Sequence, residues 1–209
     1  MSAETWNPPA STGTATAAVP TPPPQAATDP PTWAAAPVPR PARILAREQE
    51  SPDIFTLRLA YADGAPPPRF TPGQFNMVYL FGVGEVPISI ASDPDEPAYL
   101  DHTIRVVGRV TGGLAALQPG QQVGLRGPFG RGWPMAAAAG RDLLIVTGGL
   151  GCAPVLSVIN YAQHRRERFG RLIILQGVRH SNDLIWRRRY AAWAADPGDR
   201  HAALTVLTL

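Results

Sequence analysis

The arrangement of apolar residues changes at about residue 141, and this change divides the chain into two kinds of structure. Between residues 42 and 127, short β-like runs alternate with proline, glycine and aspartate. Six such runs at close spacing, with one helix-sized segment at residues 114–117, are typical of a small antiparallel barrel or sandwich. The runs cover residues 43–48, 54–60, 74–80, 87–91, 102–107 and 122–125.

Beyond Asp142 the pattern becomes an alternation of apolar runs with stretches of helical length. Strands are predicted at residues 143–147, 172–176 and 203–207, and helices at residues 154–166 and 183–194. Apolar strands that alternate with helices indicate a parallel sheet buried on both faces. We therefore expect a barrel domain at residues 42–134 and an α/β domain at residues 141–209.

The first 41 residues differ from the rest of the chain in composition. They contain eleven of the 24 prolines, together with alanine and threonine, and show no apolar period. Such a stretch favours extended, polyproline-like conformers over packed structure. Residues 1–41 are therefore predicted to be a disordered tail, with a proline-rich docking arm as the alternative.

The residue types that are rare or missing exclude several classes of chemistry. All 19 basic residues are arginine, which excludes lysine Schiff-base chemistry and the Gly-Lys-Ser/Thr phosphate loop. The single cysteine, Cys152, excludes a disulfide framework and any zinc finger or iron–sulfur cluster ligated by this chain alone. The four histidines lie far apart without metal-ligand spacing, so we expect no metal site.

Charge and hydropathy bear on the partners and the location of the chain. The formal net charge is +3 and arginines cluster at residues 165–171 and 187–189, which leaves a nucleic-acid-binding module as an alternative. Solvated helix faces carry such clusters too, and we expect no nucleic-acid partner. Residues 143–163 hold no charge for 21 residues, but glycines and a proline interrupt them at 148–154. We expect a cytoplasmic protein without a membrane span.

The segment at residues 143–154 carries the strongest local signal. An apolar strand ends in glycines and leads directly into a helix, which places unpaired backbone N–H groups and the positive end of a helix dipole together. Such a turn suits a nucleotide pyrophosphate, because a side chain would hold the phosphate away. Gly149 and Gly151 match the dinucleotide fingerprint Gly-x-Gly-x-x-Gly/Ala, whereas Pro154 departs from it. A plain strand-to-helix turn is the alternative.

Several motifs follow one another along the chain: Pro-Gly-Gln-Phe at residues 72–75, Val-Pro-Ile-Ser at 86–89, Gly-Pro-Phe-Gly at 127–130 and Gly-Gly-x-Gly-x-Ala-Pro at 148–154. Their order resembles the ferredoxin–NADP reductase superfamily, in which a Greek-key flavin-binding barrel precedes a pyridine-nucleotide domain. Within it, residues 42–209 look like the gamma, diaphorase-type subunits of cytosolic NiFe hydrogenases and sulfhydrogenases. The electron-transfer subunit of dihydroorotate dehydrogenase is a near relative.

The resemblance implies an FAD site on the barrel. The superfamily's Arg-x-Tyr-Ser flavin motif falls on residues 86–89, where Val86 replaces the arginine and Ile88 the aromatic residue. The flavin diphosphate is expected at the helix start that follows residue 107. As an alternative there, Thr111 is a helix cap and the glycines form a turn. The implied FAD contacts are Pro87, Ile88, Ser89, Gly108, Thr111, Gly112 and Gly113.

The resemblance also implies a nicotinamide-nucleotide site in the second domain, with contacts at Gly148, Gly149, Gly151, Ala153 and Pro154. Arg179 matches the family's Gly-x-Arg, whose arginine lies near the adenosine half of the cofactor. It suits a 2′-phosphate, yet NAD users carry the same arginine, so the choice between NAD and NADP stays open. We expect Asp183 to cap a helix that begins at Leu184, and Cys152 to be a small buried residue, with a redox role as the alternative.

Parts of the family pattern are missing from the sequence. The family's later strands carry a Cys-Gly-Pro-type segment, and the related subunits hold a [2Fe–2S] centre on a C-terminal cysteine cluster. The chain contains neither, and residues 204–209 form an apolar strand with no polar tail after it. We therefore expect a C-terminally incomplete nucleotide domain, either truncated or completed by another chain.

The resemblance implies an electron-transfer flavoprotein subunit. Such a subunit passes reducing equivalents between NAD(P)H and iron–sulfur centres of a partner oxidoreductase through FAD. The expected partners are the iron–sulfur and catalytic subunits of a NiFe hydrogenase or a similar oxidoreductase. No catalytic acid, base or nucleophile is required. The alternative is a degenerate docking subunit that binds flavin weakly or not at all.

Overall fold

The computed structural model of the chain describes residues 38–194 and 202–208. The predicted tail falls almost wholly outside these residues. The first strand begins at Arg40, two residues before the expected start of the barrel.

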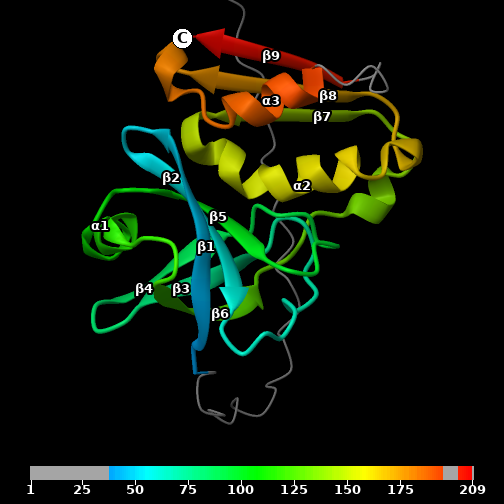
Figure 1. The fold of residues 1–209 in the computed structure, drawn as a ribbon. Helices are drawn as coiled ribbons and strands as arrows, with labels where there is room; N and C mark the ends of the chain where they lie inside the picture. The colour runs from blue at the N-terminus through cyan, green and yellow to red at the C-terminus, as the bar shows by residue number, and fades with distance from the viewer. Residues whose placement is uncertain (1–37, 195–201, 209) are drawn as a thin grey trace, which may run out of the picture. The chain divides into compact units, whose positions relative to one another are not determined.

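Six strands form one antiparallel sheet in the first half of the described chain (Figure 1). The prediction of six antiparallel strands is confirmed. The helix α1(Arg109–Ala116) lies between the fifth and sixth strands in sequence. The strands are β1(Arg40–Ser51), β2(Ile54–Tyr61), β3(Phe75–Leu80), β4(Gly84–Ser89), β5(Leu100–Arg105) and β6(Gln122–Phe129), in the spatial order β4-β3-β6-β1-β2-β5.

The barrel strands enclose an apolar core. Phe55, Leu57 and Leu59 on β2 alternate along the strand and are at most 1 % exposed. Leu114 of α1 joins the same core, which fixes the helix against the barrel. Because successive side chains of a strand point to opposite faces, these three residues share the core face, while Ile54 and Thr56 on the opposite face are buried as well.

The second half of the chain forms a parallel sheet with two helices, as predicted. The strands β7(Leu143–Gly148), β8(Leu172–Val178) and β9(Ala202–Thr208) lie in the order β7-β8-β9, and α2(Ala153–Gln163) and α3(Arg187–Ala194) connect them. Figure 1 shows α2 between this sheet and the barrel. The sheet is not buried on both faces, contrary to prediction. Within the described residues, Leu144 and Val146 of β7 are 61 % and 68 % exposed, because α2 covers the opposite face.

The start of α3 differs from the prediction. The helix begins at Arg187, three residues after the expected start at Leu184. Asp183 belongs to a 3₁₀ turn at Ser181–Asp183 and accepts a hydrogen bond from His180 N at 3.1 Å. Trp186 then adopts a left-handed conformation with φ of 57°. The expectation that Asp183 caps a helix beginning at Leu184 is therefore wrong.

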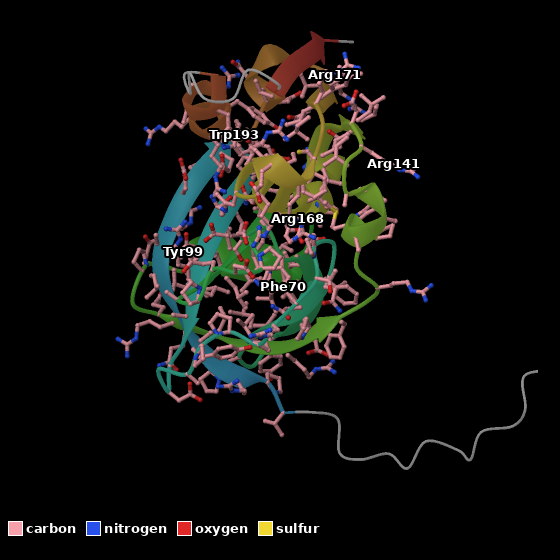
Figure 2. The ribbon with its side chains drawn as sticks, turned by 90° about the vertical axis from the view of Figure 1, so that its right-hand side faces the viewer. Phe70, Tyr99, Arg141, Arg168, Arg171 and Trp193 are labelled. Atoms are coloured by element: carbon pink, nitrogen blue, oxygen red, sulfur yellow. The ribbon has the colours of Figure 1, made fainter. Side chains whose placement is uncertain are left out.

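The barrel and the α/β part share a buried junction. Ala91 of the barrel packs in one core with Cys152, Ala153 and Leu156 around the start of α2. Asn160 Nδ2 of α2 donates to Ala91 O at 2.8 Å. Figure 2 shows Trp193 of α3 near the barrel strands at the same junction. Because Ala91 lies two residues after Ser89, the end of β4 is held next to the glycine turn that follows β7.

Among residues 38–194 and 202–208, no helix combines the length and the apolar character that a bilayer span requires.

Candidate functional site

The glycine turn after β7 presents bare backbone. A 3₁₀ turn at Gly149–Cys152 follows Gly148 and leads into α2 at Ala153. Gly149 has a φ of +51°, in the left-handed region that favours glycine. A Cβ at Gly148, Gly149 or Gly151 would meet no protein atom within 4 Å. The turn therefore leaves room for a ligand to approach its main chain.

A cavity of about 760 Å³ opens at this turn. It lies at the carboxyl ends of the parallel strands β7 and β8, where ligands bind in open α/β sheets. Its volume falls in the usual range for small-molecule sites. The lining residues are Asp53, Arg105, Gly148, Gly149, Leu150, Gly151, Gly177, Val178, Arg179, His180 and Asp183. The structure thus brings together four of the predicted nucleotide contacts: Gly148, Gly149, Gly151 and Arg179.

Charged side chains of both signs line the cavity. Arg179 is exposed, and no carboxylate within the described part of the chain pairs with its guanidinium. Arg105 forms an ion pair with Asp53 at 3.1 Å on the barrel side. The hydroxyl oxygen of Thr147, at the end of β7, is enclosed and has no hydrogen-bond partner among the described residues.

Ala153 and Pro154 do not line this cavity. Ala153 is 5 % exposed and packs in the junction core, so its side chain anchors the start of α2. Pro154 is exposed in the first helical turn, where its missing N–H leaves no partner unsatisfied. The predicted nucleotide contacts at these two positions stay predictions.

A buried series of side-chain hydrogen bonds supports the glycine turn and was not predicted from the sequence. The hydroxyl of Tyr190 donates to Gln176 Oε1 at 2.7 Å, and Gln176 Nε2 donates to Cys152 Sγ at 3.2 Å. The thiol of Cys152 donates in turn to Gly149 O at 3.0 Å. Burial raises the pKa of Cys152 to about 12, which keeps the thiol protonated. The buried, hydrogen-bonded thiol of Cys152 therefore supports the structure of the turn. In the sequence, the signal for this series of hydrogen bonds is a single glutamine, Gln176, within the apolar run of β8.

On the barrel, the predicted flavin residues of β4 divide between two faces. Val86 and Ile88 pack against the barrel core, whereas Pro87 is exposed and Ser89 is half-buried on the other face. The alternation of side chains along a strand explains the division. The side chain of Ile88 therefore lies on the core side of β4, and its predicted contact with a flavin stays a prediction.

The start of α1 holds the other predicted flavin residues. Thr111 is 5 % exposed, and its Oγ1 accepts hydrogen bonds from Val107 N and Gly108 N, both at 3.0 Å. Its side chain caps the helix, and a contact with cofactor stays a prediction. A Cβ at Gly108 or Gly112 would lie in open space, whereas one at Gly113 would lie 2.3 Å from Leu80 Cδ2. The predicted flavin contacts at Gly108, Gly112 and Gly113 stay predictions.

The two groups of flavin residues lie toward opposite ends of β4. Arg109 Nη2 of α1 donates to Val83 O at 3.2 Å, beside the first residue of β4, whereas Ser89 is its last residue. The strand separates them by about 17 Å at the usual rise per residue. Arg105, the last residue of β5 and three residues before Gly108, lines the cavity at the glycine turn.

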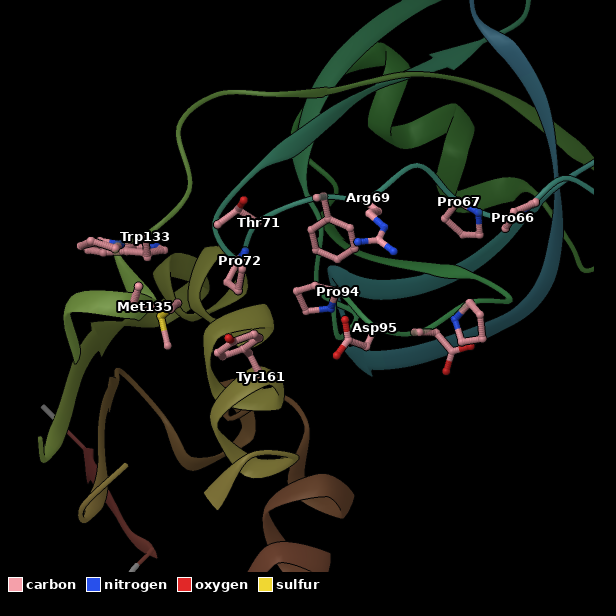
Figure 3. A pocket seen from close by; sticks show the side chains of 15 residues that line it. Pro66, Pro67, Arg69, Thr71, Pro72, Pro94, Asp95, Trp133, Met135 and Tyr161 are labelled. Atoms are coloured by element: carbon pink, nitrogen blue, oxygen red, sulfur yellow. The ribbon is translucent and has the colours of Figure 1, made fainter. Parts of the chain in front are cut away.

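A second cavity, of about 790 Å³, contains none of the predicted cofactor contacts. Figure 3 shows Trp133, Tyr161 and Pro72 among the side chains around it. Trp133 N donates to Pro72 O at 2.8 Å, and a Cβ at Gly73 would lie 2.4 Å from Trp133 Cδ1. Trp133 thus packs against the Pro-Gly-Gln-Phe motif at residues 72–75.

Metal ligands do not cluster in the described residues: no group of three or more histidine, cysteine, aspartate or glutamate side chains there is arranged to hold an ion.

Sequence comparison identifies related proteins. The family model for the "Oxidoreductase NAD-binding domain" matches residues 145–208. The gamma subunit of sulfhydrogenase 1 from Pyrococcus furiosus is 38 % identical over 143 residues, which cover 68 % of this chain and 49 % of the relative. A probable dihydroorotate dehydrogenase B electron-transfer subunit from Methanocella arvoryzae is 35 % identical over 144 residues, 68 % of this chain and 50 % of the relative. The chain spans about half the length of these curated relatives.

Solved structures share the fold. A ferredoxin NADP+ reductase from Neisseria gonorrhoeae, solved with FAD and NADP, has a TM-score of 0.66 and 22 % identity, and the match covers 80 % of this chain and 67 % of that one. The flavohem-like FAD/NAD-binding domain of nitric oxide dioxygenase from Vibrio cholerae has a TM-score of 0.70 at 15 % identity, covering 81 % of this chain and 73 % of that one. At these identities the likeness shows the arrangement of barrel and parallel sheet.

Proposed function

Because the chain belongs to the FAD- and NAD-binding proteins of the ferredoxin–NADP reductase type, related to sulfhydrogenase gamma subunits and dihydroorotate dehydrogenase B electron-transfer subunits, we propose that it is an electron-transfer subunit. It would exchange reducing equivalents between NAD(P)H and the iron–sulfur centres of a partner oxidoreductase. Bound FAD would supply the chemistry, since a flavin exchanges electron pairs with nicotinamide and single electrons with metal centres. The residues of this chain would bind the two cofactors, orient their rings and shield them from water.

The observation that carries the proposal is the bare glycine turn that opens into the cavity of about 760 Å³. The N–H groups at Gly149 and Gly151 and the N-terminus of α2 supply donors and a positive dipole for a pyrophosphate. The buried chain from Tyr190 through Gln176 and Cys152 holds the turn in place. On the barrel, Pro87 and Ser89 with the open backbone at Gly108 and Gly112 would hold the flavin.

Binding of FAD by the full chain tests the proposal directly. We expect purified protein incubated with FAD to retain about one FAD per chain after gel filtration, and NADH or NADPH to bleach the flavin absorbance under anaerobic conditions. The reason is that the proposed nucleotide contacts at Gly148, Gly149, Gly151 and Arg179 line one cavity, and the proposed flavin residues lie on one strand, β4, and at the start of α1. Protein that never retains FAD and never changes its spectrum would contradict the proposal.

Arg179 gives a second prediction, on cofactor choice. Its guanidinium lies at the cavity and has no carboxylate partner in the described residues, so it is free to pair with a 2′-phosphate. We expect Arg179→Ala to weaken NADPH binding about tenfold and NADH binding by less than about twofold, measured by isothermal titration calorimetry. Equal losses for both nucleotides would show that Arg179 does not read the 2′-phosphate.

For the partner, we propose the iron–sulfur and catalytic subunits of a hydrogenase-type oxidoreductase in the cytoplasm. These 209 residues contain one cysteine, so the cysteine ligands of any cluster would come from other sequence. A pull-down of the tagged chain from its native cells, followed by metal analysis, tests this assignment. Recovery of a dihydroorotate dehydrogenase catalytic subunit in place of a hydrogenase would correct it.

The second candidate function is a docking subunit that has lost catalysis. The packing of Val86 against the barrel core favours it, because the family's arginine for the flavin diphosphate is replaced by a side chain turned inward. Retention of FAD without any bleaching by NADH or NADPH would select this function over electron transfer.

A further inference from the structure

The two end strands of the six-stranded sheet, β4 and β5, meet at a seam beside Ser89. A few specific hydrogen bonds bridge it. Ala91 N donates to Asp101 O at 2.8 Å, and Asp101 N donates to Ser92 Oγ at 3.2 Å. The third bridge is a side chain, His102 of β5, whose Nδ1 lies 3.0 Å from Ser89 O of β4. The side chain of His102 is fully buried.

The contacts of His102 fix the position of its proton. A carbonyl oxygen only accepts, so Nδ1 carries the hydrogen that Ser89 O receives. The other ring nitrogen, Nε2, lies 3.3 Å from Asn76 Nδ2 and accepts from it. The peptide after Ser89 is also held on its other side, because Ile90 N donates to Gln74 O at 3.0 Å. The end of β4 is therefore clamped by a ring in one tautomer.

Asn76 occupies a costly position. It is 1 % exposed, and its Oδ1 is enclosed without a hydrogen-bond partner among the described residues. A Cβ at Gly127 would lie 2.3 Å from this oxygen, so Asn76 packs directly on the Gly-Pro-Phe-Gly motif of β6. An apolar residue at this position would fill the same space without the free-energy cost of burying an unpaired polar atom. The asparagine therefore needs an explanation other than packing.

We propose that His102 is a positioning residue for the flavin site: its Nδ1–H holds the carbonyl of Ser89 and so fixes the outward-facing Ser89 at the barrel seam, while Asn76 holds the ring in that tautomer. This inference rests on the proposed function, in which Ser89 contacts FAD. No group of His102 itself touches the cofactor. Its effect passes through the Ser89 peptide.

Two substitutions separate the roles of the two ring nitrogens. The amide nitrogen of His102→Asn can stand near the place of Nδ1 and donate to Ser89 O, whereas the amide oxygen of His102→Gln can reach toward the place of Nε2 and accept from Asn76. Each variant loses one of two buried hydrogen bonds, so both should unfold at similarly lowered temperatures. We expect His102→Asn to bind FAD within about twofold of the wild type and His102→Gln to bind about tenfold more weakly.

The readouts are the FAD dissociation constant from flavin fluorescence and the visible circular dichroism of the bound flavin. Thr103→Val is the matched control. Thr103 lies next to His102 on β5, and its side chain points to the opposite face. The substitution removes the buried 2.9 Å hydrogen bond between Thr56 Oγ1 and Thr103 Oγ1 and leaves the contacts of Ser89 intact. We expect this control to lower the melting temperature and to leave FAD binding unchanged.

Several outcomes would overturn the inference. If His102→Asn and His102→Gln weaken FAD binding equally, in step with their melting temperatures, the role of His102 is structural only. If the ¹⁵N shifts of the wild-type imidazole show the proton on Nε2, the proposed clamp on Ser89 does not exist. Failure of the wild type to bind FAD would overturn the proposed function, and the inference with it. If the wild type binds FAD normally and the two His102 variants bind it with equal affinity, only the inference about His102 is overturned, and the proposed function stands.

Discussion

Acidification from pH 6.5 to pH 4 is expected to lower the free energy of unfolding by about 3 kcal/mol through His102 alone. Burial lowers the pKa of His102 from 6.5 to about 4, because desolvation disfavours the charged ring more than Ser89 and Asp101 favour it. The unfolded chain takes up this proton near pH 6.5 and the folded chain only near pH 4. The stabilisation by neutral His102 is therefore complete above pH 6.5 and is lost as the pH falls to 4.

Urea unfolding of the wild type and of His102→Asn, measured from pH 7.5 to pH 4, checks this prediction. Other groups titrate in the same range. Burial raises the pKa of Glu50, which works in the opposite direction, and the pKa of Asp93 is lowered because its bonds to Arg165 and His164 outweigh burial. Both carboxylates remain in the variant, so the difference between the two curves isolates His102. A difference that is constant with pH would show that His102 titrates at its ordinary pKa.

The sequence predicts the strand framework because each signal there is local. The six runs of the barrel are bounded by proline, glycine and aspartate, and the apolar run before Gly148 leads into a glycine turn with a helix after it. Turn residues, and apolar residues spaced every second position in strands or every third to fourth position in helices, can be recognised within a few neighbouring positions. The arrangement of the nucleotide turn at Gly149 and Gly151 follows from the same short-range signals.

The residues that depend on long-range contacts were not predictable in this way. The partners of His102 on β5 are 26 residues away at Asn76 and 13 residues away at Ser89, and only the strand register brings them together. The open face of β7 at Leu144 and Val146 depends on which side the helices pack. The delayed start of α3 depends on the left-handed Trp186, a conformation that its residue type does not suggest.

Thr111 shows how one residue type supports two interpretations. A threonine near a helix start predicts a cap, and a threonine in a glycine-rich loop after a strand also predicts an anion contact. The structure assigns its Oγ1 to Val107 N and Gly108 N, which is the capping role. The open glycines on either side, Gly108 and Gly112, retain the space that a diphosphate would need.

The substitution Gly151→Val is expected to weaken NADH binding about hundredfold while the free energy of unfolding stays within about 1 kcal/mol of the wild type. The fold tolerates the change, because Gly151 is exposed, its φ is not positive, and a Cβ there meets no protein atom within 4 Å. The isopropyl group would instead occupy the space above the bare N–H groups of the turn. Loss of about two charge-assisted hydrogen bonds to the pyrophosphate corresponds to this factor.

Calorimetric titration with NADH and thermal unfolding of the same samples measure the two effects separately. The reciprocal variant, Gly112→Val at the start of α1, should weaken FAD binding and leave the NADH titration unchanged, since Gly112 does not line the cavity at the glycine turn. NADH affinity that survives Gly151→Val would mean that no pyrophosphate lies on this turn. Loss of NADH binding in both variants would mean that the two surfaces form one site, because then a side chain at either position would exclude the same ligand.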